Sequence, residues 1–206
     1  MMIFLTTMQR PATTDSRPVI LAFGDSLTAG LGVPRGKSYP EQLQKKLDAL
    51  GYKYRVVGMG ISGDTSGGGR ARMKEALAAK QSIVILELGA NDGLRGLPTI
   101  QMQANLEEMI QDFQKARAKV ILAGLTLPRN YGAPYVKSFE DVFKDLAKKY
   151  NAPLIPFFLE GVAGNPRYTL SVDDVLHPNA DGYVLVTDIV MKTLQPLLRR
   201  KSGPDG

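Results

Sequence analysis

Apolar residues recur along this chain in five short runs, separated by longer stretches in which they follow helical spacing. Runs of four or five mostly apolar residues, bounded by glycine, proline or polar residues, are typical of buried strands. They predict strands at 19–23, 54–57, 83–86, 120–123 and 154–158. Pro156 falls within the last run, which indicates a strand at the sheet edge or one that ends early.

The stretches between these runs predict helices. The clearest start is the segment Ser38-Tyr39-Pro40-Glu41, where serine and glutamate at this spacing form a capping box, and this helix stops at Gly51. Further helices are expected at about 70–79, 99–115, 135–150 and 180–198. Strands that alternate with helices predict a parallel sheet covered on both faces. The expected fold class is α/β, a three-layer α/β/α sandwich around a five-stranded parallel sheet with flavodoxin-like topology.

The length of 206 residues indicates one domain with a sizeable core. We expect this domain at 18–200, with disordered segments at 1–17 and 201–206. The net charge of +6 is scattered and no nucleic-acid motif is present, so no nucleic-acid partner is expected. No apolar run is long enough to span a bilayer, so stable membrane insertion is not expected either. These features leave the oligomeric state open.

Polar residues follow the ends of four predicted strands. The chain turns at Gly24 and presents Ser26 after the first strand; Gly63 follows the second, Asn91 the third, and a loop with Asp174 and His177 the fifth. A parallel sheet places the carboxyl ends of its strands along one edge, where ligands bind in open α/β folds. Residues far apart in the sequence are therefore expected to converge there.

His177 is the single histidine of the chain, and a general base that works near neutral pH is most often histidine. Asp174 lies three residues earlier, so one tight turn could bring its carboxylate to the imidazole, as in a serine triad. The alternative is a surface histidine before a proline, with Asp173 and Asp174 as helix-capping residues. The presence of Ser26 favours the triad.

The amino-acid composition does not favour a metal site or a cofactor. The chain has no cysteine and one histidine, so neither a zinc site nor a cysteine nucleophile is expected. We expect no metal ion and no cofactor.

Three glycine-rich segments approach known motifs without matching them. Segment 58–63 fits G-x-G-x-x-G, and Glu87 could serve as a ribose ligand, but a long loop containing Asp64 intervenes before the next helix. Segment 32–38 resembles a P-loop but has too few residues between its glycines. Segment 60–64 lacks the last glycine of a G-x-S-x-G elbow, which disfavours an ordinary α/β-hydrolase. A nucleotide-binding module is therefore the less favoured alternative.

Four sequence blocks, in order, resemble the GDSL (SGNH) hydrolase superfamily and, within it, the bacterial thioesterase I and arylesterase group, which is lysophospholipase-like. The blocks are Gly24-Asp25-Ser26-Leu27, Ile61-Ser62-Gly63-Asp64-Thr65, Gly89-Ala90-Asn91-Asp92 and Asp174-Val175-Leu176-His177-Pro178. Segments 93–96, 127–132 and 153–158 also resemble that group. Each block alone is a weak signal, whereas four in the family order are highly specific. One departure is Gly58, where relatives often have asparagine.

The resemblance implies a serine esterase. Ser26 would attack an acyl carbonyl, His177 would accept its proton and Asp174 would orient His177. The oxyanion would be held by the backbone N–H groups of Ser26 and Gly63 and by the side-chain amide of Asn91. An acyl-enzyme on Ser26 would then be hydrolysed by water.

The resemblance also implies a small-molecule ester or lipid substrate: acyl and aryl esters, with acyl thioesters and lysophospholipids as further candidates. Leu94, Arg95, Leu127 and Tyr131 are expected to line an acyl or aryl groove. The alternative within the superfamily is a carbohydrate (acetyl-ester) deacetylase. Relatives are often periplasmic or secreted, whereas this N-terminus shows no convincing signal peptide, so a cytoplasmic location also stays open.

Overall fold

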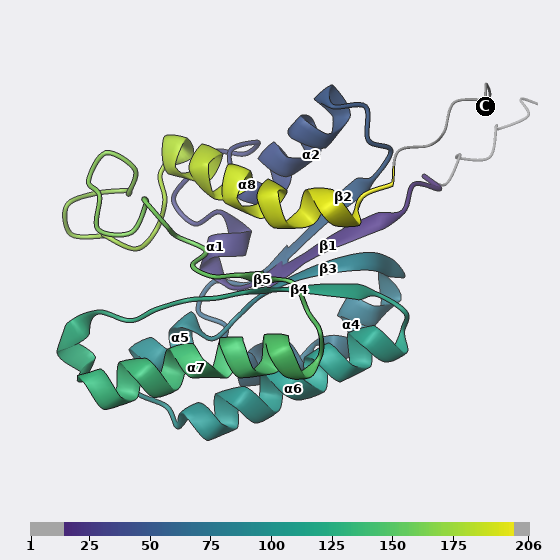
Figure 1. Cartoon of the computed structure of the whole chain (residues 1–206). Coiled ribbons are helices and arrows are strands. Elements are labelled where there is room, and N and C mark those ends of the chain that lie inside the picture. The colour runs from purple at the N-terminus through teal and green to yellow at the C-terminus, as the bar shows by residue number, and fades with distance from the viewer. Residues whose placement is uncertain (1–14, 200–206) are drawn as a thin grey trace, which may run out of the picture.

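A central five-stranded parallel sheet organises the computed structural model, which describes residues 15–199 (Figure 1). Its strands are β1 (Val19–Gly24), β2 (Arg55–Gly60), β3 (Gln81–Glu87), β4 (Lys119–Ala123) and β5 (Leu154–Ile155). They lie in the order β2-β1-β3-β4-β5, and every neighbouring pair is parallel. This is the flavodoxin-like order, so the predicted fold class is confirmed. Most of the segments expected to be disordered, 1–14 and 201–206, lies outside the described residues.

Helices cover both faces of this sheet, which gives the three layers seen in Figure 1. Helices α2 (Tyr39–Ala49) and α8 (Ala180–Leu194) pack together on one face. The opposite face carries α3 (Ser66–Ala71), α4 (Met73–Ala78), α6 (Thr99–Lys115) and α7 (Ala133–Lys149). The short elements are α1 (Ser26–Ala29), α5 (Ala90–Leu94) and the 3₁₀ helices η1 (Arg129–Tyr131) and η2 (Gln195–Leu197).

The core lies on the two faces of the central strands β1 and β3. Every residue of β1 is buried, and so is every residue of β3 except Ser82. Phe23 of β1 meets Phe113 of α6 edge to face, with ring centroids 5.8 Å apart. Strands that are packed on both faces in this way hold their carboxyl ends, and the residues directly beyond them, in fixed positions.

Several expected boundaries are confirmed and have a visible cause. The capping box of α2 is present: the backbone N–H and hydroxyl of Ser38 donate to the Glu41 carboxylate at 3.2 and 2.7 Å. Strand β5 lies at the sheet edge and ends at Ile155, directly before Pro156. The last helix is shorter than expected, because α8 ends at Leu194 and η2 follows it.

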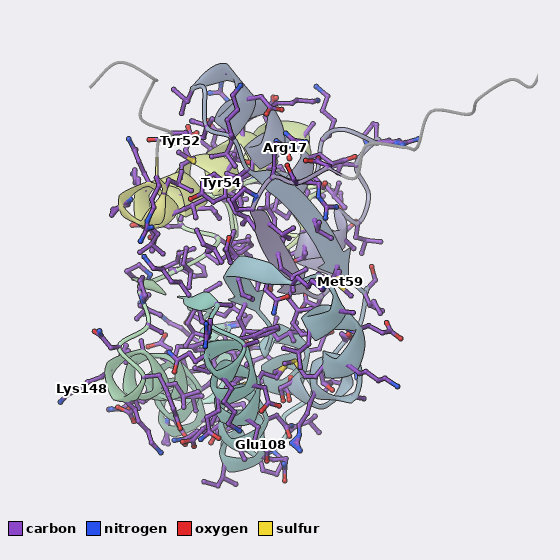
Figure 2. The ribbon with its side chains drawn as sticks, turned by 90° about the vertical axis from the view of Figure 1, so that its right-hand side faces the viewer. Arg17, Tyr52, Tyr54, Met59, Glu108 and Lys148 are labelled. Carbon is purple, nitrogen blue, oxygen red and sulfur yellow. The ribbon has the colours of Figure 1, made fainter. Side chains whose placement is uncertain are left out.

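The glycine-rich region differs from its prediction. Residues 58–69, between the predicted strand 54–57 and the predicted helix 70–79, contain the end of β2 and the start of α3, so only residues 61–65 connect them. Figure 2 labels Tyr54, the residue before this edge strand, and Met59, the residue before its last one. Glycine at 60 is required because an added Cβ would lie 2.2 Å from the backbone nitrogen of Ala29 in α1. The G-x-G-x-x-G match thus begins inside a strand, where it cannot form a strand-to-helix phosphate loop.

The expected helix 70–79 is also broken into two. Helix α3 ends at Ala71 and α4 begins at Met73, so Arg72 lies at the junction between them. Three consecutive glycines fall in α3, where they are poor helix formers. Close packing explains one of them, since a Cβ on Gly69 would lie 2.2 Å from the Leu88 side chain.

Among residues 15–199, no helix combines the length and the apolar character that crossing a lipid bilayer requires.

Gly60→Ala should destabilise the protein. Its Cβ would lie within 2.7 Å of three backbone atoms, in Asp25, Thr28 and Ala29, and overpacking of this kind costs about 1–3 kcal/mol. The matched control is Gly58→Ala in the same strand, whose Cβ would make an ordinary contact of 3.5 Å with Pro40. Denaturant-induced unfolding of both variants measures the difference. Equal stability of the two would contradict this account of the packing of α1 on β2.

Candidate active site

Ser26 is the first residue of α1, directly beyond the end of β1. Asp25 caps this short helix, since its carboxylate accepts a hydrogen bond of 3.0 Å from the Leu27 N–H. Gly24 is the last residue of the strand rather than a turn residue. Its lack of a side chain matters for space: a Cβ would lie 2.1 Å from the Thr28 hydroxyl and 2.4 Å from the Glu87 carboxyl.

Three predicted residues meet beside this helix. The Ser26 Oγ lies 2.9 Å from the His177 Nε2, and the His177 Nδ1 lies 2.9 Å from both carboxylate oxygens of Asp174. Because a carboxylate can only accept, Nδ1 carries the proton in this contact and Nε2 is left as the acceptor for the serine hydroxyl. Ser26 is buried, whereas the side chains of His177 and Asp174 are 24% and 36% exposed, so the contact lies at a mouth open to solvent.

The loop that carries Asp174 and His177 is held by its own hydrogen bonds. The Ser171 hydroxyl accepts the Asp174 N–H at 3.0 Å, and the Leu170 N–H donates to the His177 carbonyl at 3.0 Å. Burial raises the pKa of Asp174, but hydrogen bonds from the His177 backbone and ring outweigh it and leave the pKa below its usual range. Asp174 is therefore a carboxylate at neutral pH. Sequence reasoning missed Ser171, although a serine three residues before an aspartate is a common local turn signal.

The predicted oxyanion donors lie on neighbouring segments. Gly63 has φ +83°, and a Cβ there would meet only the Arg95 side chain at 3.6 Å, so the left-handed backbone is what requires glycine. Within residues 15–199, the backbone N–H groups of Ser26 and Gly63 donate no hydrogen bond. Both are thus available to an incoming oxygen.

Asn91, the second residue of α5, is already hydrogen-bonded. Its side-chain Nδ2 donates to the Asp25 carboxylate at 3.0 Å and to the Asp64 carbonyl at 2.9 Å. These two bonds tie the end of β3 to the ends of β1 and β2. Both hydrogens of the amide are engaged, so Asn91 can contribute to an oxyanion only if one of these bonds is shared or redirected.

Two buried carboxyl groups lie behind Ser26, and sequence reasoning did not assign them to this site. Glu87 is fully buried at the end of β3 and accepts hydrogen bonds from the Thr28 hydroxyl at 2.8 Å and the Asp25 N–H at 3.3 Å. Burial raises the pKa of Glu87 well above its usual range, and the neighbouring Asp25 adds to the effect. Burial also raises the pKa of Asp25 to about 6, against the hydrogen bonds that its carboxylate accepts. Glu87 therefore keeps its proton to a higher pH than an exposed glutamate does.

A cavity of about 350 Å³ opens beside Ser26 and His177. Apolar side chains make up most of its lining, among them Leu94, Leu125, Leu127, Phe157, Leu159 and Leu176. Its charged or titratable lining residues are Asp25 and His177 alone, within the described part of the chain. The cavity thus offers an apolar surface next to the Ser26 hydroxyl and the His177 imidazole.

Two of the four expected groove residues lie elsewhere. Leu94 and Leu127 line the cavity, but Arg95 and Tyr131 do not. The Arg95 guanidinium donates to the Gly63 carbonyl at 2.8 Å, and the Tyr131 hydroxyl donates to the Leu94 carbonyl at 2.9 Å. Both side chains are occupied in holding the backbone around the site.

Among the described residues, no group of three or more acidic or histidine side chains is arranged to hold a metal ion.

The sheet order and the contacts at Ser26 are those of a serine hydrolase built on a flavodoxin-like fold. Over residues 22–185 the chain matches the GDSL-like Lipase/Acylhydrolase family. It is 42% identical over 197 residues to esterase TesA of Pseudomonas aeruginosa, covering 95% of this chain and 94% of the relative. It is 39% identical over 194 residues to thioesterase 1/protease 1/lysophospholipase L1 of Escherichia coli K12, covering 94% and 89%.

A solved structure agrees. The crystal structure of TesA aligns with a TM-score of 0.83 at 43% identity, covering 87% of this chain and 99% of that one. The chain belongs to the GDSL-like lipase/acylhydrolase family. It is a serine ester hydrolase, which confirms the activity class that the four sequence blocks imply.

Glu87→Gln tests the buried acid. A carboxyl group with a raised pKa stabilises the fold fully below its ordinary pKa, and this contribution is lost as pH rises toward the raised value. Glutamine keeps the size and carries no titrating proton, so the free energy of unfolding should fall less between about pH 5 and about pH 8 than in the wild type. Denaturant unfolding at both pH values measures it, with the exposed Glu160→Gln as control. A wild-type pH dependence in Glu87→Gln would contradict the assignment.

Proposed function

We propose that this protein hydrolyses esters of apolar acyl or aryl groups through an acyl-enzyme on Ser26. The observation that carries the proposal is the 2.9 Å contact between the Ser26 Oγ and the His177 Nε2 at the mouth of the apolar cavity. It joins an activated nucleophile to a surface that suits an apolar substrate.

Proton transfer follows from the hydrogen bonds around His177. As the Ser26 Oγ attacks the acyl carbonyl carbon, the His177 Nε2 takes the hydroxyl proton. The Asp174 carboxylate, 2.9 Å from Nδ1, fixes the tautomer and stabilises the imidazolium that forms. The proton on Nε2 then passes to the leaving alcohol or thiol. Water activated by the same nitrogen releases the acid from Ser26.

The negative charge that develops on the carbonyl oxygen needs hydrogen-bond donors. The N–H groups of Ser26 and Gly63 supply two, and the Asn91 amide supplies a third when one of its bonds is shared with the substrate oxygen. Fixed donors of this kind act mainly on the transition state, and losing one typically costs about 10²–10³ in kcat.

The lining of the cavity supports the substrate class. Leucine and phenylalanine side chains suit an alkyl chain or an aromatic ring, and the lining has few groups that could hydrogen-bond a sugar. The name of the Escherichia coli relative includes both thioesterase and lysophospholipase. It extends the proposal to acyl thioesters and lysophospholipids, whose acyl chains would occupy the same cavity.

Ser26→Ala and His177→Ala should each lower kcat by on the order of 10⁴–10⁶, because each removes a member of a unit that works together. Circular dichroism should show that both variants keep the fold. Ser138→Ala, at an exposed serine of α7, is the matched control and should keep wild-type turnover. Normal turnover in either active-site variant would refute the triad.

The rate of hydrolysis should depend on the length of the acyl chain. Each methylene buried in the cavity contributes about 0.8 kcal/mol, so kcat/KM should rise roughly fourfold per added carbon from the acetyl ester until the cavity is filled. A series of p-nitrophenyl esters measures it. A preference for the acetyl ester would instead support a deacetylase.

A further inference from the structure

The side chain of Arg72 lies beneath the ends of two strands that carry the proposed site. This arginine sits at the junction of α3 and α4 and is only 9% exposed. Its guanidinium donates to the Gly24 carbonyl at 2.8 Å, to the Met59 carbonyl at 2.9 Å and to the Asp64 carboxylate at 2.7 Å. Its central carbon lies 4.0 Å from the ring centroid of Phe23. One side chain thus links β1, β2 and the loop 61–65.

Asp64 connects Arg72 to the proposed oxyanion donors. It follows Gly63 directly, and its carbonyl accepts the Asn91 amide at 2.9 Å. Its carboxylate also packs against α3, since a Cβ on Gly68 would lie 2.5 Å from an Asp64 oxygen. The Arg72–Asp64 ion pair is therefore connected to two of the three proposed oxyanion donors, the Gly63 N–H and the Asn91 amide.

Arginine suits this position for a geometric reason. Its planar guanidinium holds five N–H donors in a fixed fork, so it can reach three acceptors in different directions at once. A lysine ammonium is a compact point charge on a flexible stem and cannot span the same three oxygens. A buried ion pair adds little net stability, but one with good geometry fixes its neighbours in place.

We propose that the Arg72–Asp64 ion pair positions the Gly63 N–H and the Asn91 amide relative to the Ser26 hydroxyl. The pair acts on the transition state and leaves substrate binding unchanged. Among the described residues, neither of the two is part of the cavity lining, and the hydrogen bonds of their side chains go to neither Ser26 nor His177, so both are positioning residues. The inference rests on the proposed function of these groups.

Arg72→Lys is the primary test. We expect kcat to fall by about 10–100-fold, because displacement of fixed groups by about 1 Å can cost about 10²-fold, while KM stays within about twofold. The matched control is Arg70→Lys in α3, which should keep wild-type values, because Arg70 pairs at the surface with Glu108 of α6. Figure 2 labels Glu108. Wild-type kcat in a folded Arg72→Lys variant overturns the proposal, and so does a loss confined to KM.

Two inhibitors distinguish displaced oxyanion donors from a distorted cavity in Arg72→Lys. An alkyl trifluoromethyl ketone forms a tetrahedral adduct with the serine, whereas the methyl ketone of the same chain fills the cavity without a stable adduct. In Arg72→Lys the inhibition constant of the first should rise by the factor by which kcat falls, and that of the second should not change. An equal rise for both would indicate a distorted cavity and contradict the proposal.

Asp64→Asn and chemical rescue cover the case in which Arg72→Lys does not fold. Asparagine keeps the size of Asp64 and removes the charge, so a similar fall in kcat is expected, and wild-type kcat would overturn the proposal.

Added guanidinium ion should raise the kcat of Arg72→Ala but not that of Arg70→Ala. Activity retained in Ser26→Ala would refute the proposed function itself. If Ser26→Ala loses activity while Arg72→Lys and Asp64→Asn retain it, only the positioning role of the Arg72–Asp64 pair is refuted.

Discussion

The parallel register of β1 with its two neighbours is the constraint on which the site depends. Gly24, the last residue of β1, pairs with Gly60 of β2 on one side and with Glu87 of β3 on the other. Residues directly beyond these three positions therefore start from one level at the edge of the sheet. That is why Ser26, Gly63 and Asn91 lie together although they are far apart in the sequence. His177 arrives from a longer loop, and hydrogen bonds within that loop hold it in place.

Fixing the ends of three strands at one level brings polar and charged groups into the interior. Asp25, Glu87 and Arg72 are all buried there, and taking charges out of water is costly unless they are paired or neutral. Each case is resolved differently: Arg72 is paired with Asp64, Asp25 accepts hydrogen bonds from Leu27 and Asn91, and burial raises the pKa of Glu87, which favours its neutral form. The bonds that Arg72 and Asp25 make also connect the segments around Ser26, whereas the Oε1 of Glu87 has no hydrogen-bond partner among the described residues. Stability and preorganisation of the site therefore share one network.

The sequence predicts the parts of this structure that follow from local pattern. Apolar runs identify the central strands, and the single histidine beside an aspartate identifies a candidate base. The prediction that the second strand ends at residue 57 is wrong, because glycine at 58 and 60 favours a loop by propensity. In the structure the strand continues, and the close approach of α1 is what requires Gly60. Tertiary contacts account for the other differences. Arg95 resembles a ligand-binding residue in the sequence but donates to a backbone carbonyl, and no helical pattern distinguishes the buried Arg72 from the exposed Arg70.

In the proposed function, Ser26 is a nucleophile that His177 makes reactive. An alkyl fluorophosphonate reacts covalently with such a serine, and peptide mass mapping locates the adduct. We expect a single adduct per chain, on Ser26, formed rapidly in the wild type and far more slowly in His177→Ala. An adduct on another serine, or equal labelling rates in the two proteins, would contradict it.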